Sequence, residues 1–135
     1  MPCALIMAND KPHVFYGYAI VDSGCVLTIP AGTQLHFHPN SGLIIYKGSL
    51  NATGSVSNRI VFQGDRLEYA YEEIPGQWDG IRFIQAKSSY MEHCLVKNGF
   101  FGVWCDTTFS SSDQLDLVKV EIRNEASIGL YINAG

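Results

Sequence analysis

The sequence predicts an all-β fold, a single-stranded right-handed parallel β-helix that forms one domain over residues 1–135. Three observations predict it. Short runs alternate between apolar and polar residues, turn-forming residues bound these runs, and a glycine-then-apolar piece recurs along the chain. A chain of 135 residues can form a core of its own, and the repeat spacing indicates about four to five short coils.

The alternation has the period of two that a β-strand requires, since successive side chains of a strand point to opposite faces. Turn formers separate the runs, as in Pro30-Ala31-Gly32 and Asn98-Gly99. No segment has convincing helical spacing, although residues 66–73 could form one helical turn. We expect inward-facing side chains at Leu27 and Ile29, Leu35 and Phe37, Ile60 and Phe62, Ile81 and Phe83, Cys94, Val96 and Cys105, and Val118, Val120 and Ile122.

The recurring piece begins with a glycine and continues with apolar residues, at Gly42, Gly80, Gly102 and Gly129. The step from Gly80 to Gly102 is 22 residues and the step from Gly102 to Gly129 is 27, as expected for a solenoid repeat. The step from Gly42 to Gly80 is 38 residues. We interpret the acidic and aromatic stretch at about residues 65–78 as a loop inserted into one coil, because removing roughly a dozen residues restores the period.

Two asparagines mark a second repeated feature. Asn98 follows Leu95-Val96-Lys97, and Asn124 follows Glu121-Ile122-Arg123. We expect both at matching corners, where an asparagine side chain can bond the backbone of its own turn and stack on the next coil. Short, regularly spaced strands are also compatible with a sandwich or a barrel. The return to the same glycine piece after about three strands favours the β-helix.

The chain resembles a known group of repeat proteins. The residues that carry the resemblance are 27–33 (LTIPAGT), 42–45 (GLII), 48–54 (GSLNATG), 60–62 (IVF) and 76–81 (GQWDGI). They resemble the repeats of right-handed parallel β-helix proteins of bacterial surface and secreted type, notably lipoproteins of the Bacteroides group. The resemblance covers roughly residues 14 to 133 and implies a cell-surface or secreted location. Pectate lyases, polygalacturonases and pectin methylesterases share this fold and bind polysaccharide along the helix face.

The resemblance also implies a longer protein with an export signal. The last coil, residues 127–135, stops shortly after a strand without a polar capping segment. We therefore expect an incomplete or uncapped C-terminal end, which exposes apolar side chains and unpaired backbone groups. Because such an end can be covered by another copy, we also predict that the chain self-associates through it.

Composition and local patterns argue against several classes of partner. The net charge of −4 provides no basic stripe for nucleic acid. The apolar run at residues 1–8 is too short for a membrane span and has no positive flank, so we expect neither a span nor a signal peptide in this chain. The four cysteines match no zinc pattern, and no phosphate-binding loop is present, so no cofactor is predicted.

The inserted loop is the first candidate site, because insertions lie on one face of a solenoid and often carry binding. Aromatic faces stack on sugar rings while carboxylates accept hydrogen bonds from hydroxyl groups, so we predict a carbohydrate contact here. The alternative is that the loop packs its aromatic rings on the coil. The predicted ligand-binding residues are Tyr69, Tyr71, Glu72, Trp78 and Asp79.

His36 and His38 form the second candidate, because alternation places them on one face of a strand, where two histidines can chelate a transition metal. No third or fourth ligand is evident from the sequence, although His13, Asp65 or Glu68 could approach in three dimensions. The alternative is a pair of exposed strand residues.

Three functions follow from these features. We favour a non-enzymatic structural or binding module that contacts a glycan or a surface protein. A polysaccharide lyase or glycoside hydrolase fragment is the alternative, with Asp79 and Asp106 or Asp65 and Glu68 as carboxylate pairs. The chain lacks the acidic pairs of polygalacturonases and the arginine-rich strand of pectate lyases. A metal-binding surface protein is the second alternative.

Overall fold

The computed structural model describes residues 3–7, 12–66, 74–106 and 115–132. Every regular element in these ranges is a β-strand, which confirms the predicted all-β class. The helical turn considered for residues 66–73 lies almost entirely outside the described residues. Within the described ranges, no helix has the length and apolar character that a membrane crossing requires.

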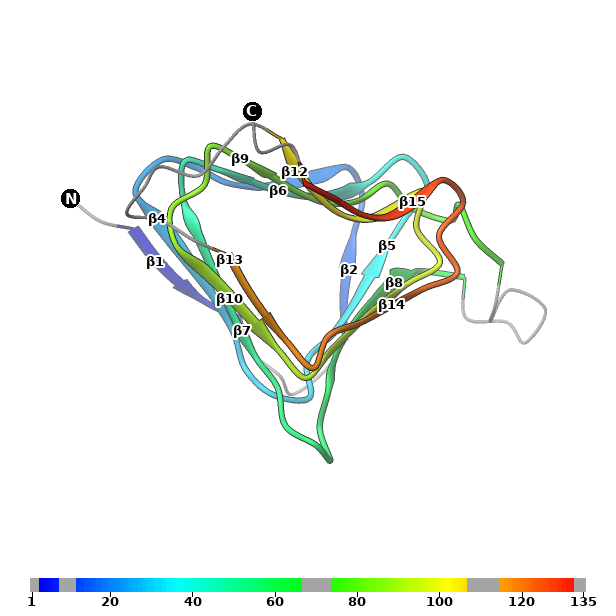
Figure 1. Cartoon of the computed structure of the whole chain (residues 1–135), viewed down its shortest axis with the longest axis horizontal. Helices are drawn as coiled ribbons and strands as arrows, with labels where there is room; N and C mark the ends of the chain where they lie inside the picture. Colours follow the sequence, from blue (N-terminus) through cyan, green and yellow to red (C-terminus); the bar gives the residue numbers. More distant parts are fainter. Residues whose placement is uncertain (1–2, 8–11, 67–73, 107–114, 133–135) are drawn as a thin grey trace.

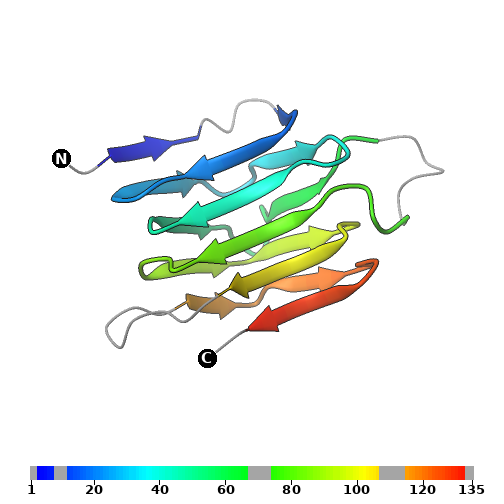
Figure 2. The ribbon, with the colours of Figure 1, turned by 90° about the horizontal axis from the view of Figure 1, so that it is seen from above.

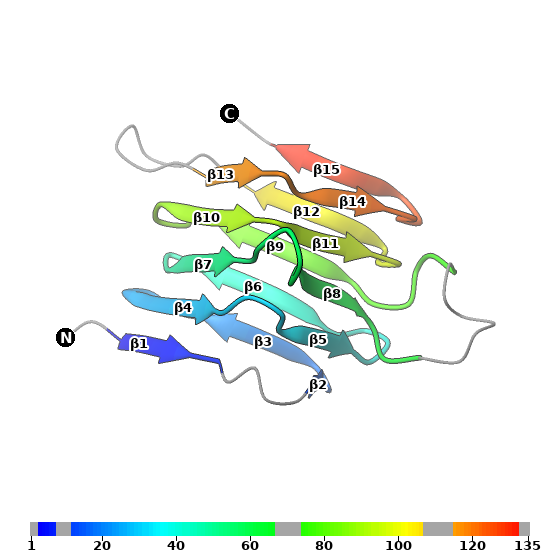
Figure 3. The ribbon, with the colours of Figure 1, turned by 90° about the horizontal axis from the view of Figure 1, so that it is seen from below.

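The strands form three parallel sheets that make the sides of a triangular solenoid (Figure 1). Sheet A has the order β1-β4-β7-β10-β13, sheet B the order β14-β11-β8-β5-β2, and sheet C the order β15-β12-β9-β6-β3. Each coil contributes one strand to each sheet, so that β1–β3 form the first coil and β13–β15 the fifth. The coils stack in chain order (Figure 2, Figure 3). This is the predicted right-handed parallel β-helix, with a coil number within the expected range.

The strand bounds of the five coils are as follows. They are β1 (Cys3–Ile6), β2 (His13–Phe15), β3 (Tyr18–Val21), β4 (Cys25–Ile29), β5 (Gln34–Phe37), β6 (Gly42–Tyr46), β7 (Ser49–Thr53), β8 (Ile60–Gly64), β9 (Gly80–Ile84), β10 (Ser89–Glu92), β11 (Cys94–Lys97), β12 (Phe101–Asp106), β13 (Leu115–Val118), β14 (Glu121–Arg123) and β15 (Ile128–Ile132).

The glycine-then-apolar pieces of the sequence are the sheet C strands of successive coils. Leu43 of β6 pairs with Ile81 of β9, Ile81 pairs with Val103 of β12, and Val103 pairs with Leu130 of β15. The repeat inferred from spacing is therefore a structural repeat. The long first interval contains the insertion, whose described ends leave the stack between β8 and β9, at the corner between sheets B and C (Figure 1).

The asparagines occupy matching corners, as predicted. Asn98 and Asn124 have φ angles of 65° and 57°, in the left-handed region that asparagine tolerates better than most residues. The backbone N–H of Asn98 donates to the carbonyl of Arg123 on the next coil, at 3.3 Å. The corners therefore continue the interstrand bonding from one coil to the next. All described strand pairs are parallel, which excludes the antiparallel sandwich and the up-and-down barrel.

The core fills the inside of the triangle with most of the side chains that alternation predicts to face inward. The prediction is wrong for Val118, which is in register with Glu92, because Leu117, the partner of buried Met91, faces the core instead. Leu35, Phe37, Ile60 and Phe62 are fully buried, as are Cys94 and Val96 in the fourth coil. Rings also stack from coil to coil. The Phe15 and Phe37 centroids are 4.9 Å apart. Phe37 in turn lies 4.4 Å from Trp78, with the two ring planes inclined by only 10°.

The two end coils have one neighbour each among the described strands. In the fifth coil Leu130 is 46% exposed, whereas its register partner Val103 is fully buried. Two expectations about the C-terminal end stay predictions. They are that this end is incomplete and that another copy of the chain covers it.

Candidate functional site

The predicted insertion site falls partly outside the described residues, because Tyr69, Tyr71 and Glu72 lie in the range 67–73. Trp78 is described, and it is a core residue. Its side chain is 1% exposed, its ring stacks on Phe37, and its Nε1 donates to the carbonyl of Lys97 at 2.8 Å. Trp78 therefore has no open face for a sugar ring. For Trp78, the alternative prediction is therefore confirmed: the aromatic ring packs on the coil.

Asp79 follows Trp78 and is engaged within the fold. Its Oδ2 accepts a hydrogen bond from the Tyr18 hydroxyl two coils away. Burial raises the pKa of the Asp79 carboxyl, and the positive charge of Arg82 partly offsets this effect. A small cavity of about 90 Å³ lies beside this pair, with Arg82 and Phe101 among its lining residues. The pair ties the first coil to the third and leaves little room for a ligand.

The two histidines of the metal hypothesis have separate partners. His36 is 4% exposed, and its Nδ1 lies 3.4 Å from the carbonyl oxygen of Gly64. The Nδ1 of His38 lies 2.7 Å from Oδ2 of Asp65. Among the described residues, no group of three or more histidine, cysteine, aspartate or glutamate side chains could hold a metal ion. The alternative of exposed strand residues fails for His36, which is buried.

The outer face of sheet C carries aromatic residues, and some of them stack on one another from coil to coil. The Trp104 ring stacks on Tyr131 of the next coil, with centroids 4.2 Å apart. The Arg82 guanidinium lies 5.4 Å from the Trp104 centroid and 5.4 Å from that of Phe101. Because Arg82, Trp104 and Tyr131 are in register, they form a stack along the solenoid axis. This stack stabilises the coils, and Tyr131 at its end remains 37% exposed.

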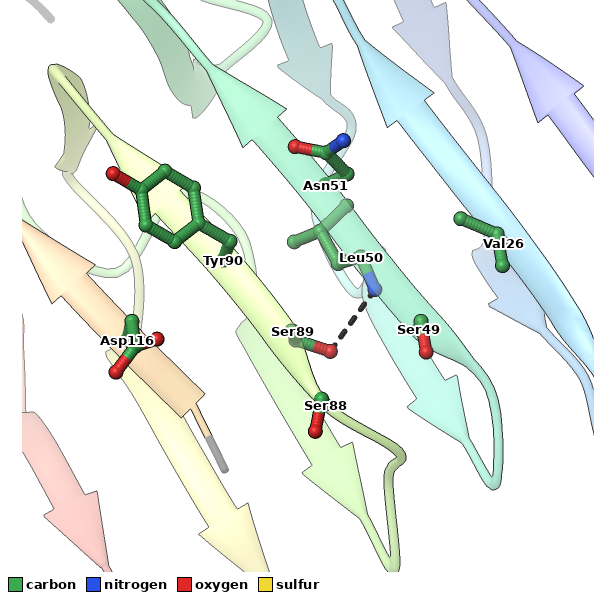
Figure 4. Close-up of a pocket in the computed structure, with 8 residues that line it drawn as sticks. All are labelled: Val26, Ser49, Leu50, Asn51, Ser88, Ser89, Tyr90 and Asp116. Carbon is green, nitrogen blue, oxygen red and sulfur yellow. Dashed lines mark hydrogen bonds between the residues drawn. The ribbon is translucent and has the colours of Figure 1, made fainter. Parts of the chain in front are cut away.

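The outer face of sheet A contains an open groove of about 690 Å³. Its walls come from four successive coils, from β4 to β13 (Figure 4). Most of the side chains that line it are polar and none is lysine or arginine. The lining residues are Val26, Ser49, Leu50, Asn51, Ser88, Ser89, Tyr90 and Asp116.

Strand register places the central groove residues side by side. Leu50 and Met91 are buried in the core, so Asn51 and Tyr90 face outward on neighbouring strands. Tyr90 pairs with Asn51 on one side and with Asp116 on the other. Parallel strands are about 4.8 Å apart, so the amide and the carboxylate flank the phenol ring at that spacing.

Hydrogen bonds hold this arrangement in place. The Tyr90 hydroxyl donates to Oε1 of Glu92 at 2.7 Å, which directs the ring along its strand. Figure 4 shows the ring nearly face-on, and none of the ring contacts in the described part of the chain includes Tyr90. The Ser89 hydroxyl accepts the backbone N–H of Leu50 at 3.0 Å and so closes the groove floor between β7 and β10.

The charges that act on the Tyr90 phenol are negative. The hydrogen bond to Glu92 raises the pKa of the Tyr90 phenol most, followed by burial and by the negative charges of Glu92 and Asp116. The groove therefore combines a partly exposed aromatic ring with an amide, a carboxylate and serine hydroxyls. Such a set can stack on an apolar ring face and exchange hydrogen bonds with hydroxyl groups.

Sequence reasoning did not find this groove. Alternation around Leu50 and Met91 indicates that Asn51 and Tyr90 face outward, which is the one signal available. Their alignment with Asp116 depends on the register of three strands that are 39 and 26 residues apart. The turns and the insertion between these strands set that register, and their lengths differ from coil to coil.

Comparisons with known proteins add no identification to this geometry. No protein-family model, no curated protein and no solved structure matches the chain.

Proposed function

We propose that this chain is a non-enzymatic binding module that holds a carbohydrate in the sheet A groove. The observation that carries the proposal is the partly exposed ring of Tyr90, fixed through its hydroxyl and flanked in register by Asn51 and Asp116. A sugar presents an apolar ring face and a rim of hydroxyl groups, so it needs both kinds of contact at one place.

The rigidity of the sheet supports this function. Asn51 and Tyr90 lie in the middle of paired strands, and Thr53 Oγ1 donates to the Asn51 Oδ1 at 2.9 Å. Side chains that are already oriented lose less conformational entropy when a ligand binds. The amide N–H groups of Asn51 remain available as donors to sugar oxygens, because its oxygen is the atom that Thr53 engages.

The groove favours binding over hydrolysis. Among its described lining residues, Asp116 is the only carboxylate, and the nearby carboxylate of Glu92 is engaged by the Tyr90 hydroxyl. Glycoside hydrolysis in most families needs two carboxyl groups that flank the scissile bond. Of the carboxylates proposed from the sequence, Asp65 pairs with His38 and Asp79 with Tyr18. Asp106 ends β12 of sheet C, and Glu68 lies outside the described residues.

We further propose that the module belongs to a bacterial cell-surface or secreted protein, where its partner is a surface glycan. The resemblance of roughly residues 14–133 to repeats of such proteins supports this location.

The experiment is a screen of the purified chain against immobilised oligosaccharides, followed by calorimetric titration of the glycans that bind. We expect Tyr90→Ala to weaken binding at least about tenfold, as the loss of one aromatic platform implies. Tyr46→Ala is the matched control, because Tyr46 is an exposed tyrosine on sheet C.

The insertion hypothesis is tested in the same titration with Tyr71→Ala. Binding that depends on Tyr71 and not on Tyr90 would move the site to the insertion. A screen without any bound glycan would contradict the carbohydrate function itself.

A further inference from the structure

The charges around the groove restrict which carbohydrate it can hold. Asp116 lies on one side of Tyr90 in register, and Glu92 holds the phenol oxygen from its own strand. Both charged groups that act on the phenol are therefore carboxylates. The second oxygen of Glu92, Oε2, lies 3.7 Å from Nε2 of His93, so the Glu92 carboxylate is shared between the phenol and this imidazole.

An open aromatic face next to a carboxylate is the arrangement that attracts an organic cation. The negative face of the tyrosine ring draws a positive charge placed above it. Asp116 lies one strand away, at about 4.8 Å in the backbone, so one ammonium group can contact both. A carboxylate has about four acceptor positions, so Asp116 can accept a ligand N–H in addition to bonds within the protein.

We infer that the groove binds a glycan that carries primary amines, in which a protonated amino sugar lies over Tyr90 and pairs with Asp116. This inference rests on the proposed carbohydrate function and specifies its ligand class. Asn51 and the serines contact the hydroxyl groups of the same chain. Neutral glycans retain the stacking and the hydrogen bonds but lose the charge pairing. Anionic glycans are repelled by Asp116 and Glu92.

The test compares three hexasaccharides that share one backbone linkage, namely the β-linked hexamers of glucose, of N-acetylglucosamine and of glucosamine. Titration is carried out at slightly acidic pH, where the amines of the glucosamine hexamer are protonated. We expect this hexamer to bind about tenfold more tightly than the other two, because it alone gains an exposed ion pair and a cation–π contact. The preference should shrink as salt is added, because these charges are exposed to solvent.

The variant that isolates the charge is Asp116→Asn, which keeps the shape of the groove. We expect it to remove the preference for the glucosamine hexamer, so that this variant binds the glucosamine and glucose hexamers with equal affinity. Glu121→Gln is the matched control, since it removes the same charge from sheet B, where Glu121 pairs with Arg59 and Arg123.

The outcomes distinguish failure of the cationic inference from failure of the carbohydrate function. Equal binding of the three hexamers, or tighter binding of the acetylated one, overturns the cationic inference and leaves the carbohydrate function standing. A preference for the glucosamine hexamer that survives in Asp116→Asn also overturns it. Failure of all three hexamers to bind, together with a negative glycan screen, overturns the carbohydrate function as well.

Discussion

Glu125 lies at the corner between β14 and β15 with its carboxyl turned back onto the fourth coil. Its Oε2 accepts the backbone N–H of Gly99 at 2.7 Å, while Oε1 is buried and has no hydrogen-bond partner among the described residues. Burial raises the pKa of Glu125 from 4.5 to about 7, and the hydrogen bond from Gly99 opposes this only partly. The folded protein therefore holds a proton at Glu125 that the unfolded chain releases near its ordinary pKa.

The sign of the pH dependence follows from this difference. The unfolded state binds fewer protons at this residue, so stability falls as the pH rises from about 4.5 to about 7. We expect Glu125→Gln to be more stable than the parent at about pH 8, by about 1 to 2 kcal/mol after allowance for solvent screening, and nearly equal at about pH 5. Urea unfolding at the two pH values measures this. An equal effect at both values would show that the carboxyl is not protonated in the folded state.

Trp78 joins the insertion to the core through a ring stack and one hydrogen bond. We expect Trp78→Ala to cost about 3 to 5 kcal/mol in unfolding free energy, as for other large buried aromatic residues. Trp78→Phe keeps an aromatic ring next to Phe37 and loses the bond to the Lys97 carbonyl, so its cost should be clearly smaller. Chemical denaturation gives both values. A neutral Trp78→Ala would contradict the placement of this ring in the core.

At the scale of single elements, the glycines that begin the sheet C strands have different roles. Gly80 has a φ of +121°, and a Cβ at this position would collide with the backbone oxygen of Phe101. Gly129 occupies the equivalent place in the fifth coil, and a Cβ there would meet its nearest atom, Ile122 Cγ2, at an ordinary 3.5 Å. A Cβ at Gly42 or Gly102 would also come too close to a backbone oxygen, so Gly129 is the tolerant position among the four glycines of the repeated piece.

We expect Gly80→Ala to destabilise the protein by about 2 kcal/mol or more, because both the backbone conformation and the space exclude a side chain. Gly129→Ala, as the matched substitution, should change stability by less than about 1 kcal/mol. Thermal or urea unfolding of the two variants distinguishes them. Equal effects would indicate that position in the repeat, and not local geometry, sets the cost.

At the scale of the whole molecule, the architecture was predictable because it depends on local patterns. Alternation around Phe37 and Phe62 identifies inward positions, and the glycine spacing identifies the coil length. The groove was not predictable in the same way, because Asn51, Tyr90 and Asp116 become neighbours only through strand register. At Trp78, by contrast, the sequence suggested a site that the structure does not contain. Aromatic and acidic composition suggested a ligand contact, whereas burial decides that its ring belongs to the core.

The stacking of coils also predicts how the molecule opens. Strands pair only with strands of adjacent coils, so the fold behaves as a nearly one-dimensional array. We expect backbone amides of β9, which has neighbours on both sides, to exchange with deuterium at least about tenfold more slowly than those of β15. Hydrogen exchange followed by mass spectrometry measures this. Uniform protection would show that the five coils open as one unit.

The two tryptophans make this opening visible by optical means. Trp104 lies between Arg82 of the third coil and Tyr131 of the fifth, so its fluorescence should change when the fifth coil detaches. Trp78 is enclosed beside Phe37 and should keep a blue-shifted emission until the central coils separate. The chain thus carries two intrinsic reporters at different depths of the stack, and single tryptophan variants can assign each signal to its coil.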